Sequence, residues 1–347
     1  MLPESWFGPA APGETRKVYG RVTESPPGGP TAEPSTASTA STAGPRPGPQ
    51  VVVVGAAARD IATDDPRGWR LGGGVAYSAL TTARLGLPTA AVVGVDRAAA
   101  TARELDLLRM AGVDVHIVEL ERGPVFDNVE TPEGRIQVGH ERADPIPVDA
   151  LPAAWRDAPA WILAAVADEL PPAWADVPDE RALVAAGWQG LLREVVAGQR
   201  VRRRPPGPSP IVARADLVGV SRDDLGPRAP VDELVGYLHP GATLVLTQGD
   251  HGGLVMTASP DGSSAMYHYP AIRSTAIVDP TGAGDVFLAA LLAARAEPRL
   301  VGGRLDSHFD LLLAAAVASL VLEGRGLLGV PERVAVRQRM TAARQGG

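Results

Sequence analysis

A carboxylate and a glycine turn stand together late in the sequence, in residues 279–287, DPTGAGDVF. Gly282 and Gly284 flank the small Ala283, so the backbone can turn tightly there and its N–H groups stay uncovered. The Ala- and Leu-rich residues that follow predict a buried helix. Because the first N–H groups of a helix lack internal partners and lie at the positive end of its dipole, the stretch predicts an anion site.

Asp285 lies in the first turn of this predicted helix. A carboxylate there can simply cap the helix and complement its dipole. Beside an anion cradle, it can instead take the proton from an attacking hydroxyl during phosphoryl transfer, while the cradle holds the transferring group. The local pattern leaves both interpretations open.

Length and composition predict one large or two medium-sized domains, since 45% of the 347 residues are hydrophobic. The formal net charge of -7 argues against nucleic acid or an anionic membrane as the main partner. No apolar run is long enough to span a bilayer, and residues 1–4 lack the basic start of a signal peptide. We therefore expect a cytoplasmic protein that binds a small molecule.

Two residue types that often carry chemistry are absent or nearly so. The chain has no cysteine, and its only lysine is Lys17. This excludes disulfides, thiolate nucleophiles, a Walker A lysine and a Schiff-base lysine. The six histidines show no metal-binding spacing, and no G-x-S-x-G motif supports a hydrolase triad. A phosphate would therefore have to be bound by backbone N–H groups, arginine and Mg²⁺.

The chain divides into a low-complexity part and a folded part. Residues 1–49 are rich in Pro, Gly, Ser, Thr and Ala and predict a disordered tail. From residue 50 onward, apolar strand-like runs alternate with helical patterns, which predicts an α/β fold with a parallel sheet. We expect strands at 50–55, 90–95, 113–119, 161–166, 182–186, 216–220, 243–247, 254–257 and 265–269, and helices at 75–85, 98–110, 231–238, 285–294, 309–323 and 332–343.

Asp60 and the glycines 72–74 follow the first predicted strand. Open α/β sheets bind ligands beyond the carboxyl ends of their strands, so Asp60 could accept hydrogen bonds from sugar hydroxyls. It could equally be a solvated loop aspartate. The glycines would let the backbone approach a ligand, or they form a plain turn.

A predicted β-hairpin at 125–139 interrupts the α/β alternation. Such an insertion can cover a site, with Asn128, Arg135 and Gln137 pointing inward, or it can be an exposed hairpin with solvated polar residues. A second insertion, residues 200–210, holds three consecutive arginines and four prolines. No aromatic residues are interleaved with these arginines, which favours a solvated loop over a nucleic-acid patch.

Taken together, these residues resemble the ribokinase-like (PfkB) carbohydrate kinases. Residues 279–287 are similar to the second signature of that family, and the order of the other motifs extends the resemblance from about residue 51 to about residue 331. The resemblance implies a three-layer α/β/α sandwich with a mainly parallel sheet. It implies a kinase domain at 50–331, with a small β lid at 124–140, followed by a C-terminal helix and tail at 332–347.

The resemblance also implies roles for individual residues. Asp285 would be the catalytic base, and the backbone N–H groups of Gly282, Ala283 and Gly284 would form the anion hole. Asp60, Gly73, Gly74 and the lid residues would bind the acceptor. The remaining positions would serve the donor and cations: Thr247, Gly249, Gly252 and Thr281 for ATP, Asp224 for Mg²⁺, and Asp279 with Thr281 for a monovalent cation such as K⁺.

Two positions depart from the family pattern. Tyr77 and Ser78 stand where the family usually has a substrate-binding asparagine, which argues against ribose or fructose as acceptor. Ser221 and Asp224 replace the asparagine and glutamate that organise Mg²⁺ waters, so oxygen ligands are kept with a shorter reach. Residues 126–128, 134–137 and 187–190 are similar to segments of the branch that includes inositol kinases.

The resulting expectation is a kinase that uses ATP and Mg²⁺ to phosphorylate a hydroxyl of a sugar or cyclitol. One alternative is a nucleoside kinase, because the same fold can accept a nucleoside ribose. Another is a catalytically silent relative that binds a sugar or nucleotide for regulation. A homodimer formed through the lid is compatible with the resemblance.

Overall fold

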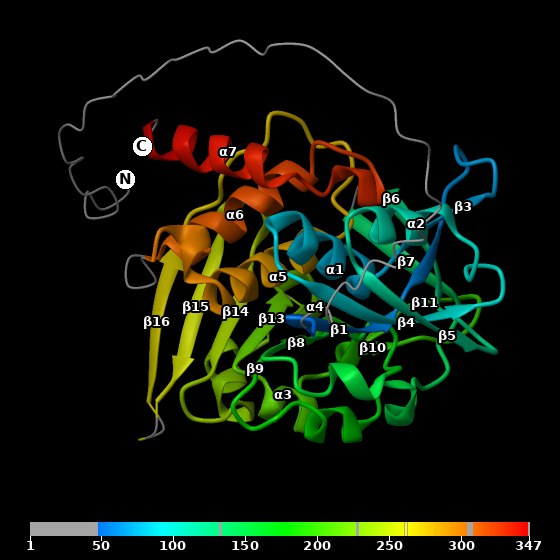
Figure 1. Ribbon diagram of the computed structural model, residues 1–347, viewed down its shortest axis with the longest axis horizontal. Coiled ribbons are helices and arrows are strands. Elements are labelled where there is room, and N and C mark those ends of the chain that lie inside the picture. Colours follow the sequence, from blue (N-terminus) through cyan, green and yellow to red (C-terminus); the bar gives the residue numbers. More distant parts are fainter. Residues whose placement is uncertain are drawn as a thin grey trace, which may run out of the picture. The chain divides into compact units, whose positions relative to one another are not determined.

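The computed structural model describes residues 48–131, 134–226, 229–259, 261, 263–303 and 308–345, and it describes no side chain for 130, 131, 134 and 135. The predicted tail therefore falls outside the description, except for its last two residues. From Gly48 onward, helices cover both faces of a large sheet (Figure 1). No helix within these ranges is long and apolar enough to cross a membrane.

Among the described residues, a nine-stranded sheet has the order β16-β15-β14-β13-β9-β8-β1-β4-β5. Neighbouring strands from β14 to β5 are parallel, and β15 and β16 add an antiparallel edge. The sheet strands are β1 (Val51–Ala56), β4 (Thr89–Asp96), β5 (Asp114–Leu120), β8 (Ala160–Leu163), β9 (Leu183–Gly187), β13 (Leu217–Ser221), β14 (Thr243–Thr247), β15 (Gly253–Ala258) and β16 (Ser264–Tyr269).

Two layers of helices flank this sheet, as the apolar patterns predict. Helices α1 and α5 pack on one face, with α6 and α7 outside them, while α3 lies on the other face (Figure 1). The predicted three-layer α/β/α sandwich is thereby confirmed. The helices are α1 (Gly74–Leu85), α2 (Arg103–Met110), α3 (Pro210–Arg214), α4 (Arg222–Leu225), α5 (Ala283–Ala296), α6 (Phe309–Val321) and α7 (Arg333–Gln345).

Short 3₁₀ turns connect many of these elements. One of them, η6 (Val231–Tyr237), replaces the α-helix expected at 231–238, and Pro230 and Gly236 at its ends are residues that disfavour a longer helix. The others are η2 (Val148–Ala150), η3 (Ala153–Trp155), η4 (Pro172–Asp176), η5 (Gln189–Leu192), η7 (Gly249–His251), η8 (Pro298–Val301) and η10 (Gly326–Gly329).

A second sheet, in the order β11-β7-β6-β2-β3, forms the small β layer. The expected hairpin is present as β6 (Val125–Thr131) and β7 (Gly134–Glu141). The sheet is larger than the hairpin, because β2 (Ala58–Ile61) and β3 (Trp69–Gly72) extend one side and β11 (Gln199–Arg200) extends the other.

The second sheet corrects two of the predictions made from the sequence. Asp60, expected in a loop after the first strand, lies on β2, where it pairs with Arg70 and Phe126. The insertion at 200–210, expected as a solvated loop, begins with strand β11 of the lid and continues with β12 (Arg202–Arg203) paired to β10 (Arg193–Glu194). Such two-residue pairings carry no sequence pattern of their own, since they are set by the strands they join.

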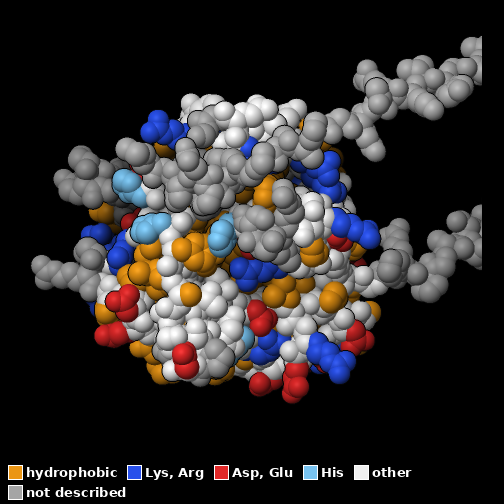
Figure 2. Space-filling view, turned by 90° about the vertical axis from the view of Figure 1, so that its left-hand side faces the viewer, with side chains coloured by type: hydrophobic (Ala, Val, Ile, Leu, Met, Phe, Trp, Pro, Cys, Tyr) orange, Lys and Arg blue, Asp and Glu red, His pale blue; other side chains and the backbone are white. Residues whose placement is uncertain are grey.

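The sheet edge at β16 is the face shown in Figure 2, where histidine side chains lie beside hydrophobic ones. His308 stacks on Tyr267 of β16 with 4.5 Å between ring centroids, and Met266 is 55% exposed.

The opposite edge of the nine-stranded sheet is strand β5. The direction of winding reverses between β1 and β8, because β4 and β5 continue from one side of β1 and the remaining parallel strands from the other. In open α/β sheets, ligands bind at such a switch point.

Candidate active site

The glycine turn at the start of α5 has the backbone geometry that the sequence predicts. Gly282 caps the helix in the left-handed conformation, with φ of 82°. Val286 N–H donates to Gly282 O at 2.9 Å, which closes the first turn. Gly284 is exposed, and an added Cβ there would meet nothing within 4 Å, so no side chain covers the turn at this position. The N–H of Ala283 makes a long contact of 3.4 Å with Pro280 O. This turn can hold an anion.

Asp279 holds the turn in place from the other side. Its Oδ1 accepts a hydrogen bond from Thr281 N–H at 2.9 Å, and its Oδ2 accepts one from Gly326 N–H at 3.0 Å. The carboxylate thereby ties the turn to the segment that follows α6. Both oxygens already accept backbone N–H groups, so the geometry supports a positioning role for Asp279 more directly than the cation-binding role expected from the sequence.

Tyr77 fills the space directly behind Gly282. Its side chain is 1% exposed, and a Cβ added to Gly282 would collide with the Tyr77 ring. Any residue but glycine at this position would therefore meet both the strain of the left-handed backbone and this collision. The sequence resemblance places Tyr77 among acceptor-binding residues. In the structure, the ring of Tyr77 packs against Gly282 and supports the anion turn.

Asp285 follows the turn, and its carboxyl has a raised pKa. Burial raises its pKa from 3.8 to about 6; nearby Arg193 lowers it and Asp224 raises it further. A carboxylate with such a pKa is ionised at neutral pH and is a stronger base than an exposed aspartate. Within the described part of the chain, no hydrogen bond or ion pair of Asp285 is recorded, so helix capping does not account for it.

The glycine triplet 72–74 lies between Asp285 and Asp60. A Cβ added to Gly74 would lie 2.8 Å from Asp285 Oδ1, and one added to Gly72 would collide with Asp60 Oδ2. Gly73, with φ of 92°, packs against the backbone at the end of β1. The absence of three side chains thus brings two carboxylates, distant in sequence, to the two ends of one short backbone segment.

The lid sheet adds amide groups to Asp60. Asn128 Nδ2 donates to Asp60 Oδ1 at 3.3 Å, and Gln137 Nε2 donates to Asn128 Oδ1 at 2.9 Å. Asn128 and Gln137 are register partners on β6 and β7, so their side chains share one face. The structure thus brings together Asp60, Asn128 and Gln137, three of the seven predicted acceptor residues. The side chain of Arg135, another of them, lies outside the described part of the chain.

The donor side of the predicted site lies at the ends of β13 and β14, where Ser221 pairs with Thr247. Thr247 leads into the turn at η7, in which Gly249 and Gly252 have φ of 58° and 78°. An added Cβ at Gly249 would meet nothing within 4 Å, whereas one at Gly252 would lie 2.7 Å from Ala271 N. Gly249 leaves its backbone open to a ligand, while Gly252 shapes the turn.

Asp224 is the carboxylate best placed for Mg²⁺. It forms a capping box with Ser221, accepts from Gln189 Nε2 at 2.9 Å, and lies 3.9 Å from Arg193 Nη2. Among the described residues, no three His, Asp or Glu side chains form a metal cage. Mg²⁺ is usually bound by one or two carboxylates together with substrate phosphates. One carboxylate beside the donor turn fits this mode of binding.

Two residues that the sequence analysis did not identify complete the site. Glu169 is fully buried, and its carboxylate accepts hydrogen bonds from the backbone N–H groups of Ala56, Val166 and Ala167 at 2.7–3.1 Å. It therefore ties the ends of β1 and β8 together at the switch point. Burial raises the pKa of this carboxyl, and the N–H groups oppose the shift. The sequence signal that could have identified Glu169 is an acidic residue shortly after a predicted core strand.

Arg193 is the second residue. It lies on β10 with 14% of its side chain exposed, above the ring of Phe126 and close to Asp224. Its charge also lowers the pKa of Asp285. No sequence pattern identifies this residue, because β10 has only two residues and its position depends on the fold.

The C-terminal part of the chain matches a family model. Residues 211–332 match the pfkB family carbohydrate kinase, and they include the DPTGAGD stretch, Asp224 and the η7 turn. Over these residues the chain is similar to that family. No curated protein matched the sequence.

Solved structures with the ribokinase fold superpose over most of the chain. A pyrophosphate-dependent kinase in the ribokinase family, complexed with a pyrophosphate analog and myo-inositol, has a TM-score of 0.62 and 22% identity, covering 83% of this chain and 99% of its own. Arabidopsis thaliana ribokinase, complexed with ribose and ATP, has a TM-score of 0.58 and 18% identity, covering 84% and 99%. At these identities the similarity establishes the fold, and the predicted ribokinase-like fold is confirmed.

Replacing Gly282 with alanine should damage both folding and function. The left-handed backbone alone costs about 1–2 kcal/mol for a non-glycine residue, and the collision with Tyr77 adds roughly 1–3 kcal/mol. Gly198→Ala is a matched control, because Gly198 has φ of 72° and open space around it. Chemical denaturation should show the larger loss for Gly282→Ala. Equal losses would mean that Tyr77 does not constrain the turn.

Asp285→Asn should stabilise the fold above pH 6. The folded pKa is raised, so ionising Asp285 in the folded state costs stability as the pH rises from about 3.8 to about 6. Asparagine removes that charge. Melting temperatures measured from pH 4 to pH 8 should therefore show a gain over the unmodified protein at high pH, and the gain should fade towards pH 4. A variant that is less stable at pH 8 would contradict the burial of an ionised carboxylate.

Proposed function

We propose that the protein is a kinase that transfers a phosphoryl group from ATP to a hydroxyl of a sugar or cyclitol. The observation that carries this proposal is the pair of carboxylates, Asp60 and Asp285, at the two ends of the glycine triplet. Asp60 can hold acceptor hydroxyls, while Asp285 lies where a base can meet the reacting one. The anion turn of α5 begins immediately beside Asp285.

In the proposed reaction, Asp285 accepts the proton of the acceptor hydroxyl as that oxygen attacks the terminal phosphorus. The new O–P bond forms while the bond to the leaving diphosphate breaks, and charge on the transferring group is stabilised by the N–H groups of Gly282, Ala283 and Gly284. Mg²⁺, when bound beside Asp224, would neutralise the donor phosphates. Catalysis then rests on positioning and electrostatics, as is usual for phosphoryl transfer.

The lid sheet supports the choice of a polyol as acceptor. Asp60, Asn128 and Gln137 form a continuous chain of hydrogen-bonding groups with carboxylate and amide character. Such a row can pair with several adjacent hydroxyls, each of which both donates and accepts. Myo-inositol and ribose are the acceptors found in two of the similar structures, which agrees with this reading.

Pyrophosphate is the second candidate donor. A similar structure is described as a pyrophosphate-dependent kinase in the ribokinase family, with 20% identity to this chain. The anion turn and Asp224 would serve either donor, because both present a terminal phosphoryl group. A nucleoside remains the second candidate acceptor, and the nucleoside kinase of Methanocaldococcus jannaschii has a TM-score of 0.55 to this chain.

The proposal is tested by phosphoryl transfer to matched panels of sugars, cyclitols and nucleosides, with ATP or pyrophosphate as donor and Mg²⁺ present. We expect one polyol to be phosphorylated, and Asp285→Asn to lower kcat by at least ~10²–10⁴-fold, as for loss of a general base. Asp106→Asn, on the exposed surface of α2, is the control and should keep full activity. Undiminished turnover by Asp285→Asn would remove Asp285 from the mechanism. Donor binding without transfer to any acceptor would favour the silent, regulatory alternative.

A further inference from the structure

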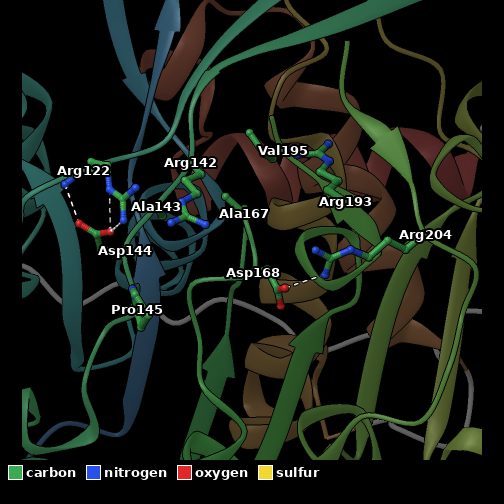
Figure 3. A pocket seen from close by; sticks show the side chains of 10 residues that line it. All are labelled: Arg122, Arg142, Ala143, Asp144, Pro145, Ala167, Asp168, Arg193, Val195 and Arg204. Carbon is green, nitrogen blue, oxygen red and sulfur yellow. Dashed lines mark hydrogen bonds and ion pairs between the residues drawn. The ribbon is translucent and has the colours of Figure 1, made fainter. Parts of the chain in front are cut away.

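An arginine-lined cavity of about 240 Å³ opens next to the candidate active site (Figure 3). Its walls come from segments after β5, after β7 and after β8, together with β10 and the residues after β12. The charged side chains among its lining residues are Arg122, Arg142, Arg193, Arg204, Asp144 and Asp168. The lining therefore carries two more positive than negative charges.

Two ion pairs hold the walls of this arginine pocket in position. Arg122 Nε lies 2.9 Å from Asp144 Oδ1, and Arg204 Nη1 lies 2.6 Å from Asp168 Oδ2. Pairing with Arg122 lowers the pKa of Asp144, so this carboxylate stays ionised. Asp168 has φ of 63°, one of two such non-glycine residues in the described chain. Backbone strain of this kind persists where surrounding contacts enforce it, and it often marks a binding site.

Arg142 is the arginine of this pocket that belongs to neither of the two ion pairs. Its guanidinium lies between the two ion pairs in Figure 3, and no side-chain hydrogen bond or ion pair of Arg142 is recorded within the described ranges. Arginine presents a planar set of donors that matches the oxygens of a carboxylate or phosphate. Arg142 is exposed, and its charge also lowers the pKa of Asp144. Beside two arginines that are oriented by aspartates, its donors suit the oxygens of an acid group.

Arg193 connects the arginine pocket to the reacting centre. It lines the cavity, lies 3.9 Å from Asp224, and is close enough to Asp285 to lower the pKa of that carboxyl. Ala167 also lines the cavity, and its N–H donates to Glu169, which joins the ends of β1 and β8 at the switch point. A molecule whose hydroxyl meets Asp285 could therefore extend into this cavity.

The position of the cavity favours the acceptor over the donor as its occupant. The donor turn follows β14, two strands away from β9 in the sheet order. The lining contains no residue of the donor turn, and it contains none of Asp60, Asn128, Gln137 and Asp285, so the assignment depends on which segments form the walls. The cavity walls include the segment that leaves lid strand β7, and the lid carries the acceptor residues Asn128 and Gln137. The acid group is therefore expected on the molecule that the lid covers.

We propose that the arginine pocket binds an acid group, a carboxylate or a phosphate, carried by the acceptor. The inference rests on the proposed kinase function and narrows its substrate class from any sugar or cyclitol to an acidic one. Arg142 and Arg204 would act as specificity-determining residues. They hold the acid group so that a hydroxyl elsewhere on the acceptor is presented to Asp285.

The test compares matched neutral and acidic acceptors: glucose with gluconate and glucose 6-phosphate, ribose with ribose 5-phosphate, and myo-inositol with myo-inositol 1-phosphate. The unmodified protein should prefer an acidic member, and the preferred one distinguishes carboxylate from phosphate. Arg142→Ala should raise KM for that acceptor about 10–100-fold, the loss of a charge-assisted hydrogen bond. KM for the donor and for neutral acceptors should not change.

Three further variants sharpen the test. Arg142→Lys should recover part of the lost affinity, since it keeps the charge without the planar donors. Arg204→Ala should raise KM for the acidic acceptor, as Arg142→Ala does. Arg109→Ala is the control, because it removes an arginine that is paired with a surface aspartate, and it should leave KM unchanged. Thermal melting checks that each variant is folded.

Several outcomes would overturn the inference while leaving the kinase proposal intact. They are preference for a neutral acceptor, an Arg142→Ala variant with unchanged KM, or a rise in KM for the donor instead of the acceptor. If no acceptor is phosphorylated at all, the kinase proposal fails, and titration calorimetry with the same acids tests the pocket alone. Binding that Arg142→Ala weakens would support an acid-binding pocket, and absence of binding would overturn it.

Discussion

An ionisable carboxylate held away from water is the feature on which the rest of this site depends. Burial of Asp285 is unfavourable for its charged form, yet this same burial makes it a stronger base than an exposed aspartate. The surrounding residues reduce the free-energy cost of burying the ionised form of Asp285, and they do not neutralise its charge. Arg193 favours the ionised form, and the first turn of α5 places positive N–H dipoles beside it. The left-handed backbone at Gly282 and the close packing of Tyr77 maintain this arrangement.

The topology explains how residues so distant in the chain reach one place. Strands β1 and β8 adjoin at the switch point, where Glu169 joins their ends through three backbone N–H groups. Every loop that contributes to the site leaves the carboxyl edge of the parallel sheet or belongs to the lid sheet beside it. The groups that we propose to select the acceptor lie on the lid and on the loops around the arginine pocket.

The sequence predicted the fold, and the place of Asp285 beside the glycine turn, because both follow local rules. The buried strands, the helix after the glycine turn, and Asp285 in its first turn could all be read from spacing and residue type. Asp60 was identified but assigned to a loop, since strand β2 has only four residues. Glu169 was missed although it follows a predicted core strand, whereas Arg193 and Arg142 could not be identified as site residues from the sequence. Their roles arise from packing between segments that no local pattern joins, and Arg204 appeared only as part of an exposed arginine run.

The central claim is that Asp285 acts as a base with a raised pKa. Its most direct test is the pH dependence of kcat/KM, which reports the ionisation of the free enzyme. The acceptor used should not titrate between pH 5 and pH 8. We predict that kcat/KM rises with pH, reaches half of its plateau value near the Asp285 pKa of about 6, and stays level at higher pH. A profile that is flat from pH 5 to pH 8, or one that falls as the pH rises, would contradict it.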